Sequence, residues 1–187
     1  MSNIVLISGS PTPKSRSTAV LTYVGDQLQA QGHTLASVSV QDLPPEDLVY
    51  GNFQSPALQQ IQAKVAAAQG VVIATPVYKA TYTGILKALL DLLDQNAFVD
   101  KTVMSIATGG TIAHLLAIDY GLKPLLTVMG STHQLKGIFL LSSQINFGES
   151  GALTLDAEVK SGSKMALRPN ACKALSRVRP DYQIEPE

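Results

Sequence analysis

The stretch Ser8–Ser17, with the sequence SGSPTPKSRS, decides how this chain folds. It follows the apolar run IVLI at 4–7 and precedes a segment with helical periodicity at 17–31. The pattern predicts a strand that leads through a loop rich in glycine and serine into a helix. The start of a helix carries unpaired backbone N–H groups and a partial positive charge, so it binds phosphate groups well.

The side chains of this loop suit a terminal phosphate. Ser10, Ser15 and Ser17 supply hydroxyl groups, and Arg16 supplies a charged fork of donors. Gly9 lets the backbone approach a ligand closely. A simple turn with a serine cap at the helix start explains the same residues equally well. The loop alone therefore leaves both interpretations open.

Two common phosphate loops do not match this stretch. The Walker pattern requires a glycine directly before its lysine, whereas Pro13 precedes Lys14. The dinucleotide pattern G-x-G-x-x-G requires further glycines nearby, and the next glycine after Gly9 is Gly25. A monophosphate such as that of FMN fits the loop better than a triphosphate or a dinucleotide.

Length and composition indicate the general class of protein. The chain has 187 residues, of which 45% are hydrophobic, as in a globular domain. Lys+Arg and Asp+Glu number 14 each, so neither nucleic acid nor an anionic membrane is expected as a partner. One cysteine, Cys172, excludes an internal disulfide, and neither a signal peptide nor an apolar run of ~20 residues is present. We expect one cytoplasmic domain over residues 1–187.

Short apolar runs alternate with longer helical patterns along the chain. The runs predict strands at 4–7, 35–40, 71–75, 102–107 and 137–141. The helical patterns predict helices at 17–31, 56–69, 83–95 and 112–129. Several strands are continuously apolar, as expected for strands buried on both faces of a parallel sheet. This alternation predicts an α/β, flavodoxin-like three-layer sandwich with a five-stranded parallel sheet of order 2-1-3-4-5.

Ligands of such sheets bind at the carboxyl ends of the strands, near the point where the strand order reverses. Two further unusual loops are expected there, Thr75–Gly84 and Thr108–Thr111. Because the carboxyl ends of parallel strands meet at one edge, the three loops predict a single site.

The loop after the third strand offers what a flavin ring needs. Val77 and Tyr78 supply an apolar wall, and the backbone N–H groups of Tyr78 and Lys79 meet the polar edge of the ring. Pro76 stiffens the approach because its ring fixes φ. Each residue also has an ordinary structural explanation, and it is their combined placement that favours a flavin site.

The loop after the fourth strand completes this prediction. Thr108 and Thr111 flank Gly109 and Gly110, which let the backbone approach the far edge of the ring. His114 contacts a flavin or a nicotinamide, or has a surface or capping role. The three histidines lack the spacing of metal ligands. No catalytic side chain is expected, because a flavin itself accepts and gives the hydride.

Several motifs resemble the NADPH-dependent FMN reductases. They are the loop Ser8–Ser17, ATPVYKATYTG at 74–84 and ATGGTIAHLLAIDYGLKP at 107–124, with PEDLVY at 45–50 and SPAL at 55–58. The likeness covers residues 1 to about 145 and points to the reductase partners of alkanesulfonate monooxygenases. It implies reduction of FMN by NADPH or NADH, and transfer of reduced flavin to a flavin-dependent monooxygenase that releases sulfite for sulfur assimilation.

The sequence of the predicted helix 112–129 indicates an irregularity in its backbone. Gly121 weakens the helix, and Pro124 removes the N–H that would bond to the carbonyl of Tyr120. A kink or π-bulge near Tyr120 is therefore predicted. The resemblance implies that Tyr120 marks a π-helix at a tetramer interface beside the flavin, so we expect a homo-oligomer, either a dimer or a tetramer.

Two other functions fit a flavin site. One is a quinone or azo reductase that keeps its FMN bound. The other is a flavodoxin-type electron carrier, against which the neutral net charge and the absence of tryptophan count.

The likeness fades after about residue 148. A helix is expected to begin within Thr154–Val159, although Ser161–Ser163 and Arg168-Pro169 interrupt it. The segment 160–179 holds six basic residues and no acidic one, which is typical of a solvated tail.

Overall fold

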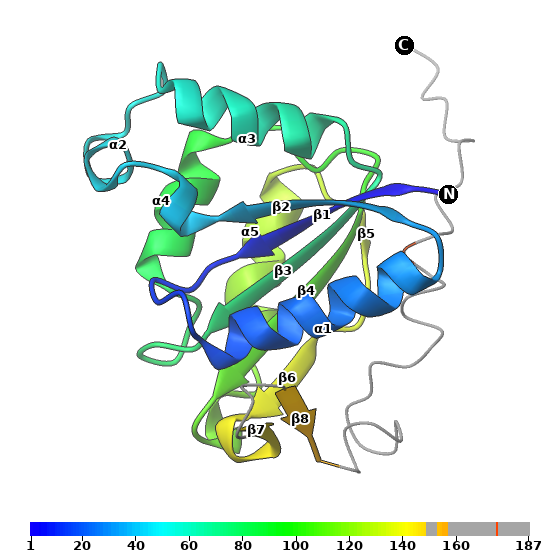
Figure 1. The fold of residues 1–187 in the computed structure, drawn as a ribbon. Coiled ribbons are helices and arrows are strands. Elements are labelled where there is room, and N and C mark those ends of the chain that lie inside the picture. The colour runs from blue at the N-terminus through cyan, green and yellow to red at the C-terminus, as the bar shows by residue number, and fades with distance from the viewer. Residues whose placement is uncertain (149–152, 157–174, 176–187) are drawn as a thin grey trace.

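The computed structural model describes residues 1–148, 153–156 and 175. Its parallel sheet has the order β2-β1-β3-β4-β5, with β6 also paired to β4 (Figure 1). The strands are β1 Asn3–Ser8, β2 Thr34–Ser39, β3 Gly70–Pro76, β4 Thr102–Gly109, β5 His133–Gln134 and β6 Ile138–Leu141. The predicted flavodoxin-like sheet and its strand order are confirmed.

The register of the sheet brings the ends of three strands together. Ser8 of β1 lies beside Ala74 of β3, and Pro76 of β3 lies beside Thr108 of β4. Because these strands are parallel, the loops that follow β1, β3 and β4 leave the sheet at the same edge, at the lower left of Figure 1.

The fifth strand differs from the prediction. A single strand at 137–141 was expected, but the structure divides this part of the sheet into β5 and β6. Thr102 pairs with His133, and Ile106 pairs with Ile138, so both short strands lie against β4. Between them, Leu135 N donates to the carbonyl of Val103 over 2.9 Å.

Three helices begin at a hydroxyl side chain that accepts a backbone hydrogen bond. Ser15, Ser55 and Thr83 cap α1, α3 and α4 in this way. The helices are α1 Arg16–Ala30, α2 Pro45–Tyr50, α3 Pro56–Ala66, α4 Gly84–Leu92 and α5 Lys123–Val128. Helix α2 was not predicted. It begins at Pro45 and ends at Gly51, which adopts a left-handed conformation with φ +65°.

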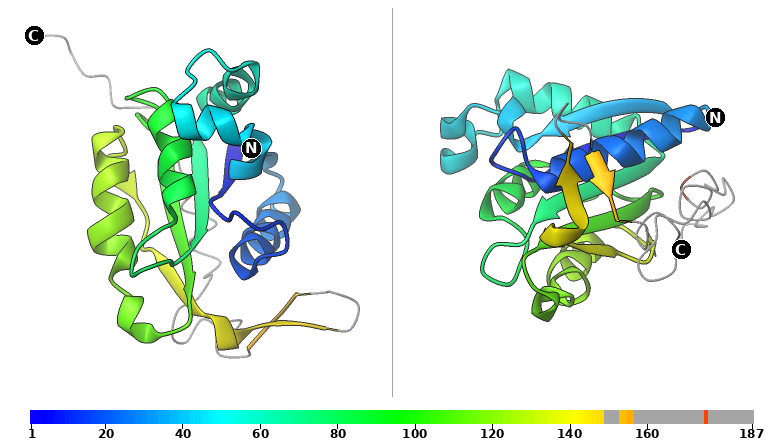
Figure 2. Two further views of the ribbon diagram at one scale, coloured as in Figure 1. Left: turned by 90° about the vertical axis from the view of Figure 1, so that its left-hand side faces the viewer. Right: turned by 60° about the horizontal axis from the view of Figure 1, so that its bottom comes forward.

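The helices cover the sheet in two layers. On one face, α1 buries Val20 and Val24 against Leu6 and Val72. On the other face, α3, α4 and α5 bury an apolar core with the opposite side chains of the strands. Figure 2 (left) shows the sheet between α1 on one side and α4 and α5 on the other. The three-layer prediction is thus confirmed.

The segment predicted as one helix at 112–129 consists of three pieces. A 3-10 turn at Ile112–His114 is followed by a π-helix at Ile118–Leu122 and then by α5. Lys123 N donates to the carbonyl of Ile118, five residues earlier. The predicted π-bulge near Tyr120 is confirmed.

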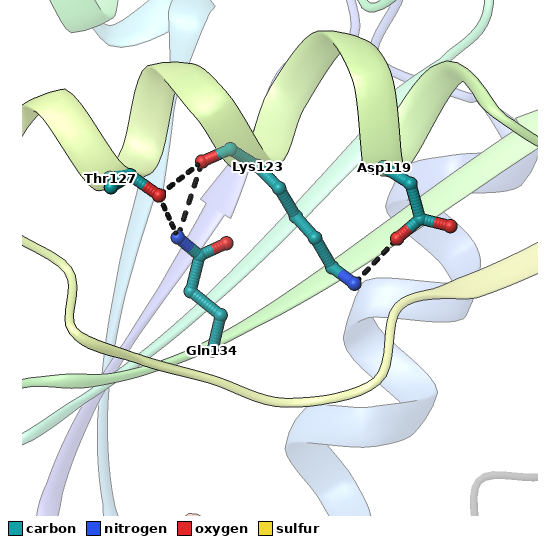
Figure 3. Close-up of polar contacts among 4 residues, drawn as sticks. All are labelled: Asp119, Lys123, Thr127 and Gln134. Carbon is teal, nitrogen blue, oxygen red and sulfur yellow. Dashed lines mark hydrogen bonds and ion pairs between the residues drawn. The ribbon is translucent and has the colours of Figure 1, made fainter.

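Side-chain contacts surround the junction between the π-helix and α5, as Figure 3 shows. Gln134, on β5, donates from Nε2 to the carbonyl of Lys123 over 3.2 Å and to Oγ1 of Thr127 over 2.9 Å. Asp119 and Lys123 form an ion pair of 2.5 Å along the exposed surface. The carbonyl of Lys123 therefore has a partner outside its own helix.

A hairpin lies beside α1 on the same face of the sheet (Figure 2, right). It consists of β7, Ile145–Phe147, and β8, Leu153–Leu155. The prediction of a helix that begins near Thr154 is wrong, because Thr154 pairs antiparallel with Asn146. Cys172 and the basic side chains of 160–179 lie outside the described residues. None of the helices in the described ranges is long and apolar enough to span a membrane.

Candidate functional site

Hydrogen bonds join the three loops at the carboxyl edge of the sheet. Gly9 N donates to the carbonyl of Ala74 over 2.8 Å, and the hydroxyl of Thr83 donates to the carbonyl of Gly9 over 2.6 Å. Val77 N donates to the carbonyl of Thr108 over 2.8 Å. The loop after β1 is thus tied to the loop after β3, which is tied in turn to the end of β4.

The start of α1 offers donors for an anion. Ser15 caps the helix, because its Oγ accepts a 3.0 Å hydrogen bond from Thr18 N. The amides of Arg16 and Ser17 occupy the first two helical positions, where backbone N–H groups have no partner within the helix. Together with the helix dipole, these amides favour a phosphate at this point.

Two of the predicted phosphate contacts lie inside the loop. Ser10 and Ser17 are only 1% and 0% exposed. The Ser10 hydroxyl donates to the carbonyl of Thr12 over 3.1 Å and accepts from Thr12 N over 3.2 Å. The Ser17 hydroxyl lies 3.1 Å from that of Ser15. In this arrangement Ser10 and Ser17 shape the loop. Ser15 is half-buried and its hydroxyl also lies 2.7 Å from Oγ1 of Thr18, whereas Arg16 is exposed.

The side chain of Arg16 makes a contact that the sequence did not predict. Its Nε donates to the carbonyl of Ile145, in β7, over 3.3 Å. The Nη atoms of Arg16 make no hydrogen bond to any residue in the described part of the chain, so they can reach an anion at the helix start. Arg16 therefore connects the phosphate loop to the β7–β8 hairpin.

Packing explains two of the glycines better than ligand approach does. A Cβ at Gly9 would lie 2.8 Å from Cδ2 of Leu86, on α4. A Cβ at Gly109 would lie 2.8 Å from Cζ of Phe139. A Cβ at Gly110, in contrast, would have no atom within 4 Å. Of these three glycines, only Gly110 faces open space where a ring can lie.

The loop after β3 forms a tight hairpin turn. Tyr78 N donates to the carbonyl of Thr81 over 2.9 Å, and Thr81 N donates back over 3.3 Å. Between them, Lys79 and Ala80 have φ values of +51° and +69°, as a type I′ turn requires. The prediction that the Tyr78 N–H meets a ring edge is wrong for this structure, because that N–H is used within the turn. Among the described residues, the Lys79 N–H has no hydrogen-bond partner and so remains available to a ligand.

The remaining residues that were predicted to contact the ring differ in how deeply they are buried. The Tyr78 side chain is 49% exposed, and Pro76 and Val77 are half-buried. Thr108 is buried, whereas Thr111 is exposed and its hydroxyl caps the 3-10 turn by accepting from Ala113 N. His114, at the end of that turn, is half-buried.

Two residues that support the loops were missed by the sequence prediction. Thr83 caps α4 and also holds Gly9, and its position as a hydroxyl residue at the start of the predicted helix 83–95 was the signal that could have revealed it. Phe139 forms a small cluster with Ala107 and Ile118 behind Val77. Nothing in the local sequence connects Phe139 with the loops, because the contact depends on the pairing of β6 with β4.

Comparison with known proteins decides what kind of flavin site this is. Residues 2–146 match a family model described as NADPH-dependent FMN reductase. The chain belongs to this family. The predicted enzyme class, an oxidoreductase that uses FMN and NADPH, is thereby confirmed.

Individual relatives of this FMN reductase agree with the family assignment. The chain is 46% identical over 146 residues to an FMN reductase (NADPH) of Pseudomonas putida KT2440, covering 78% of this chain and 74% of the relative. It is 44% identical over 142 residues to an FMN reductase (NADPH) of Escherichia coli K12, covering 76% and 74%. The solved apo structure of NADH:FMN oxidoreductase (EMOB) superposes with a TM-score of 0.79 at 35% identity, covering 100% of this chain and 92% of that one.

Proposed function

We propose that this reductase uses NADPH to reduce free FMN and releases the reduced flavin to a separate flavin-dependent monooxygenase. The monooxygenase partner we propose is one that removes sulfite from alkanesulfonates and so serves sulfur assimilation. The resemblance of segments 74–84 and 107–124 to the reductase partners of such enzymes supports this role.

The observation that carries the proposal is the openness of the ring side of the site. Tyr78 is 49% exposed, and a Cβ at Gly110 would meet no atom within 4 Å. Sites that retain a ligand commonly bury 70–90% of its surface. A ring that lies against these two residues keeps one face in solvent, which suits a flavin that is a substrate and leaves after reduction.

Each loop has a distinct part in holding the flavin. We assign the phosphate to Ser15, Arg16 and the first amides of α1, in a loop that Ser10 and Ser17 shape from inside. The ring lies between Pro76–Lys79 and Thr108–Thr111, with His114 close to its edge.

A bound flavin supplies the redox chemistry itself, by accepting a hydride at N5 from the nicotinamide. The protein has to hold the two rings face to face and needs no acid or base of its own.

We further propose that the functional unit is a homotetramer with Tyr120 at a subunit contact. Tyr120 is 79% exposed, and the large apolar side chains Ile112 and Leu116 on the same segment are 55% and 54% exposed. This apolar surface begins directly after Gly110, so a neighbouring subunit would lie beside the ring. Light scattering checks this: Leu116→Lys and Tyr120→Ala are expected to lower the molar mass, whereas Lys87→Ala on α4 leaves it unchanged.

A single purification followed by one assay distinguishes the candidate functions. We expect the flavin to separate from the protein during gel filtration, and NADPH oxidation to saturate with added FMN. Retained flavin with turnover only on a quinone or an azo dye would instead identify a reductase with bound FMN. Retained flavin without turnover on any of these acceptors would identify an electron carrier.

A further inference from the structure

The amide of Gln134 lies where the π-helix joins α5 (Figure 3). Its Nε2 donates to Oγ1 of Thr127 over 2.9 Å and to the carbonyl of Lys123 over 3.2 Å, and it lies 3.4 Å from the carbonyl of Ser131. A primary amide has two N–H donors, so both are used at this junction. One side chain thus binds the first residue of α5 from outside the helix.

The sheet holds Gln134 in place. Strand β5 has only two residues, and its second, Gln134, pairs with Val103 of β4. Leu135, directly after the strand, donates from its N to the carbonyl of Val103 over 2.9 Å. The backbone of Gln134 therefore has a fixed position relative to β4, and the amide transmits that position to the helix.

The oxygen of the same amide indicates that stability does not explain this contact. Oε1 of Gln134 is buried and has no hydrogen-bond partner among the described residues. Burial of an unpaired acceptor is unfavourable, and this cost offsets the gain from the donated hydrogen bonds. The carbonyl of Lys123 would also keep a partner without Gln134, because the hydroxyl of Thr127 donates to it over 3.0 Å. What Gln134 adds is a fixed position for the junction.

The position of the junction decides the register of the π-helix. Lys123 N donates to the carbonyl of Ile118, five residues earlier, whereas an α-helix joins residues four apart. Closing this turn into an α-helix would take one residue out of it. Because one residue of an α-helix corresponds to a rotation of about 100°, the residues before the junction would turn by that angle relative to α5.

Two residues of the π-helix support the loop after β3, to which the flavin ring is assigned. Ile118 belongs to the small apolar cluster against which Val77 packs. Gly121 lies so close to Thr81 that a Cβ would be 2.8 Å from its Oγ1. Val77 and Thr81 stand on either side of the turn that begins at Tyr78. A rotation of the π-helix would therefore change both supports of that turn.

We propose that Gln134 is a positioning residue for flavin binding. Its amide keeps the π-helix in register, and the π-helix in turn supports the loop that holds the flavin ring. The inference rests on the proposed flavin site and extends it to a residue of β5, outside the three loops. Gln134 acts on the ring and not on the phosphate, which is assigned to the start of α1.

Fluorescence titration of the full chain with FMN and with riboflavin tests this role. Gln134→Met keeps the length of the side chain but removes the amide. We expect the Kd for both ligands to rise by the same factor, about fivefold or more, because the loss falls on the ring that they share. The kcat at saturating FMN should stay within about twofold, and the midpoint of urea unfolding should change little.

Gln62→Met is the matched control. Gln62 is also half-buried, and its Nε2 donates over 3.2 Å to the carbonyl of Leu92, at the end of α4. The same chemical change at another helix end should leave both Kd values as they are. An equal rise in Kd for Gln62→Met would show a general effect of lost helix contacts and would overturn the proposal.

A double-mutant cycle with Gly121 distinguishes positioning from a general loosening. Gly121→Ala brings a Cβ close to Thr81 only while the π-helix keeps its register. Once Gln134→Met has released that register, Gly121→Ala should add less than about twofold to the Kd for FMN. Full additivity of the two changes, or an unchanged Kd in Gln134→Met, would overturn the proposal.

Hydrogen exchange measured without flavin provides a second readout. Gln134→Met is expected to speed exchange in both 76–83 and 116–123, and faster exchange in 116–123 alone, or in neither, would overturn the proposal. If Gln134→Met does not fold, Thr127→Val on the exposed surface of α5 removes an acceptor of the amide and should shift exchange in the same direction. Failure of NADPH to reduce FMN would contradict the proposed function alone, because hydrogen exchange does not depend on turnover.

Discussion

The hydroxyl of Thr83 donates a 2.6 Å hydrogen bond to the carbonyl of Gly9, and both residues are buried. The same hydroxyl accepts from Leu86 N over 3.2 Å and so caps α4. One side chain therefore fixes the helix that follows the ring loop to the loop that holds the phosphate. Any change at Thr83 acts on the relative position of the two halves of the flavin site.

Thr83→Val should separate this role from ordinary folding stability. The variant loses a helix cap and leaves a buried carbonyl unpaired, which together destabilise the fold by about 2–4 kcal/mol. We expect the KM for FMN to rise while kcat changes little, because the loss falls on binding. Steady-state kinetics and denaturant unfolding measure the two effects.

Two controls accompany this variant. Thr83→Ser keeps the hydroxyl and should restore the KM. Ser55→Ala removes the cap of α3 and the hydrogen bond to Asp47, so it should destabilise the protein without changing the KM. An equal rise in KM for Ser55→Ala and Thr83→Val would show that the effect is general.

Arg16→Ala tests the phosphate contact. Loss of a charged hydrogen bond should weaken FMN binding by about 1.5–3 kcal/mol, which corresponds to a roughly 10- to 150-fold higher Kd. Riboflavin lacks the phosphate, so its affinity should not change. Lys14→Ala, in the same loop, is the matched control. If the affinity for riboflavin falls as much as the affinity for FMN, Arg16 acts through its bond to Ile145 and not through the phosphate.

Gly109→Ala and Gly110→Ala should differ in which property they change, stability in the first and FMN affinity in the second. A Cβ at Gly109 would lie 2.8 Å from Phe139, so we expect a loss of stability of about 1–3 kcal/mol from overpacking. A Cβ at Gly110 meets open space, so stability should be kept while FMN affinity falls. Thermal unfolding and FMN titration of both variants check the pair. Unchanged FMN affinity in Gly110→Ala would remove this position from the ring site.

Gly121 couples the π-helix to the ring loop. A Cβ there would lie 2.8 Å from Oγ1 of Thr81, which closes the turn at Tyr78. Gly121→Ala should therefore raise the KM for FMN, and adding Thr81→Ala should relieve most of the effect because the close atom is gone. A double-mutant cycle on the KM measures this coupling. Simple additivity of the two changes would contradict the contact.

Asp47 should make stability depend on pH below neutrality. Hydrogen bonds from Ser55 and Asn52 hold the pKa of Asp47 below its ordinary value of 3.8. Because the folded pKa is lowered, the stabilisation is complete above about pH 4 and is lost as the pH falls through the folded pKa. Asp47→Asn should therefore be less stable than the parent at pH 7, and the difference should shrink towards pH 3. Urea midpoints across this range provide the measurement, and a constant difference would contradict the assignment.

The sequence alone was enough to predict features that depend on residues close together along the chain. The alternation of apolar runs and helical patterns predicted the sheet and its order. Gly121 and Pro124 predicted the π-helix at Ile118–Leu122, because both act on the backbone bonds of their own helix. A serine cap at the start of the first helix was one of the two interpretations left open for the loop, and the structure shows that Ser15 is this cap.

The contacts that complete the site depend on residues that are distant in sequence. The bond from Thr83 to Gly9, the packing of Phe139 beneath Gly109 and the bond from Arg16 to Ile145 each join segments that meet only after the strands have paired. The Tyr78 N–H was assigned to the flavin because its partner in the turn could not be read from composition.

The sequence by itself determined the elements, their order and the three loops at one edge, since hydrophobic periodicity and backbone chemistry are local. Only the tertiary structure decided which donors face outward, which glycines serve packing, and that the amide of Gln134 reaches the end of the π-helix. The physical reason is that burial and hydrogen-bond partners depend on the register of β1, β3 and β4. A slip of one residue in that register would turn every side chain of a strand to the other face.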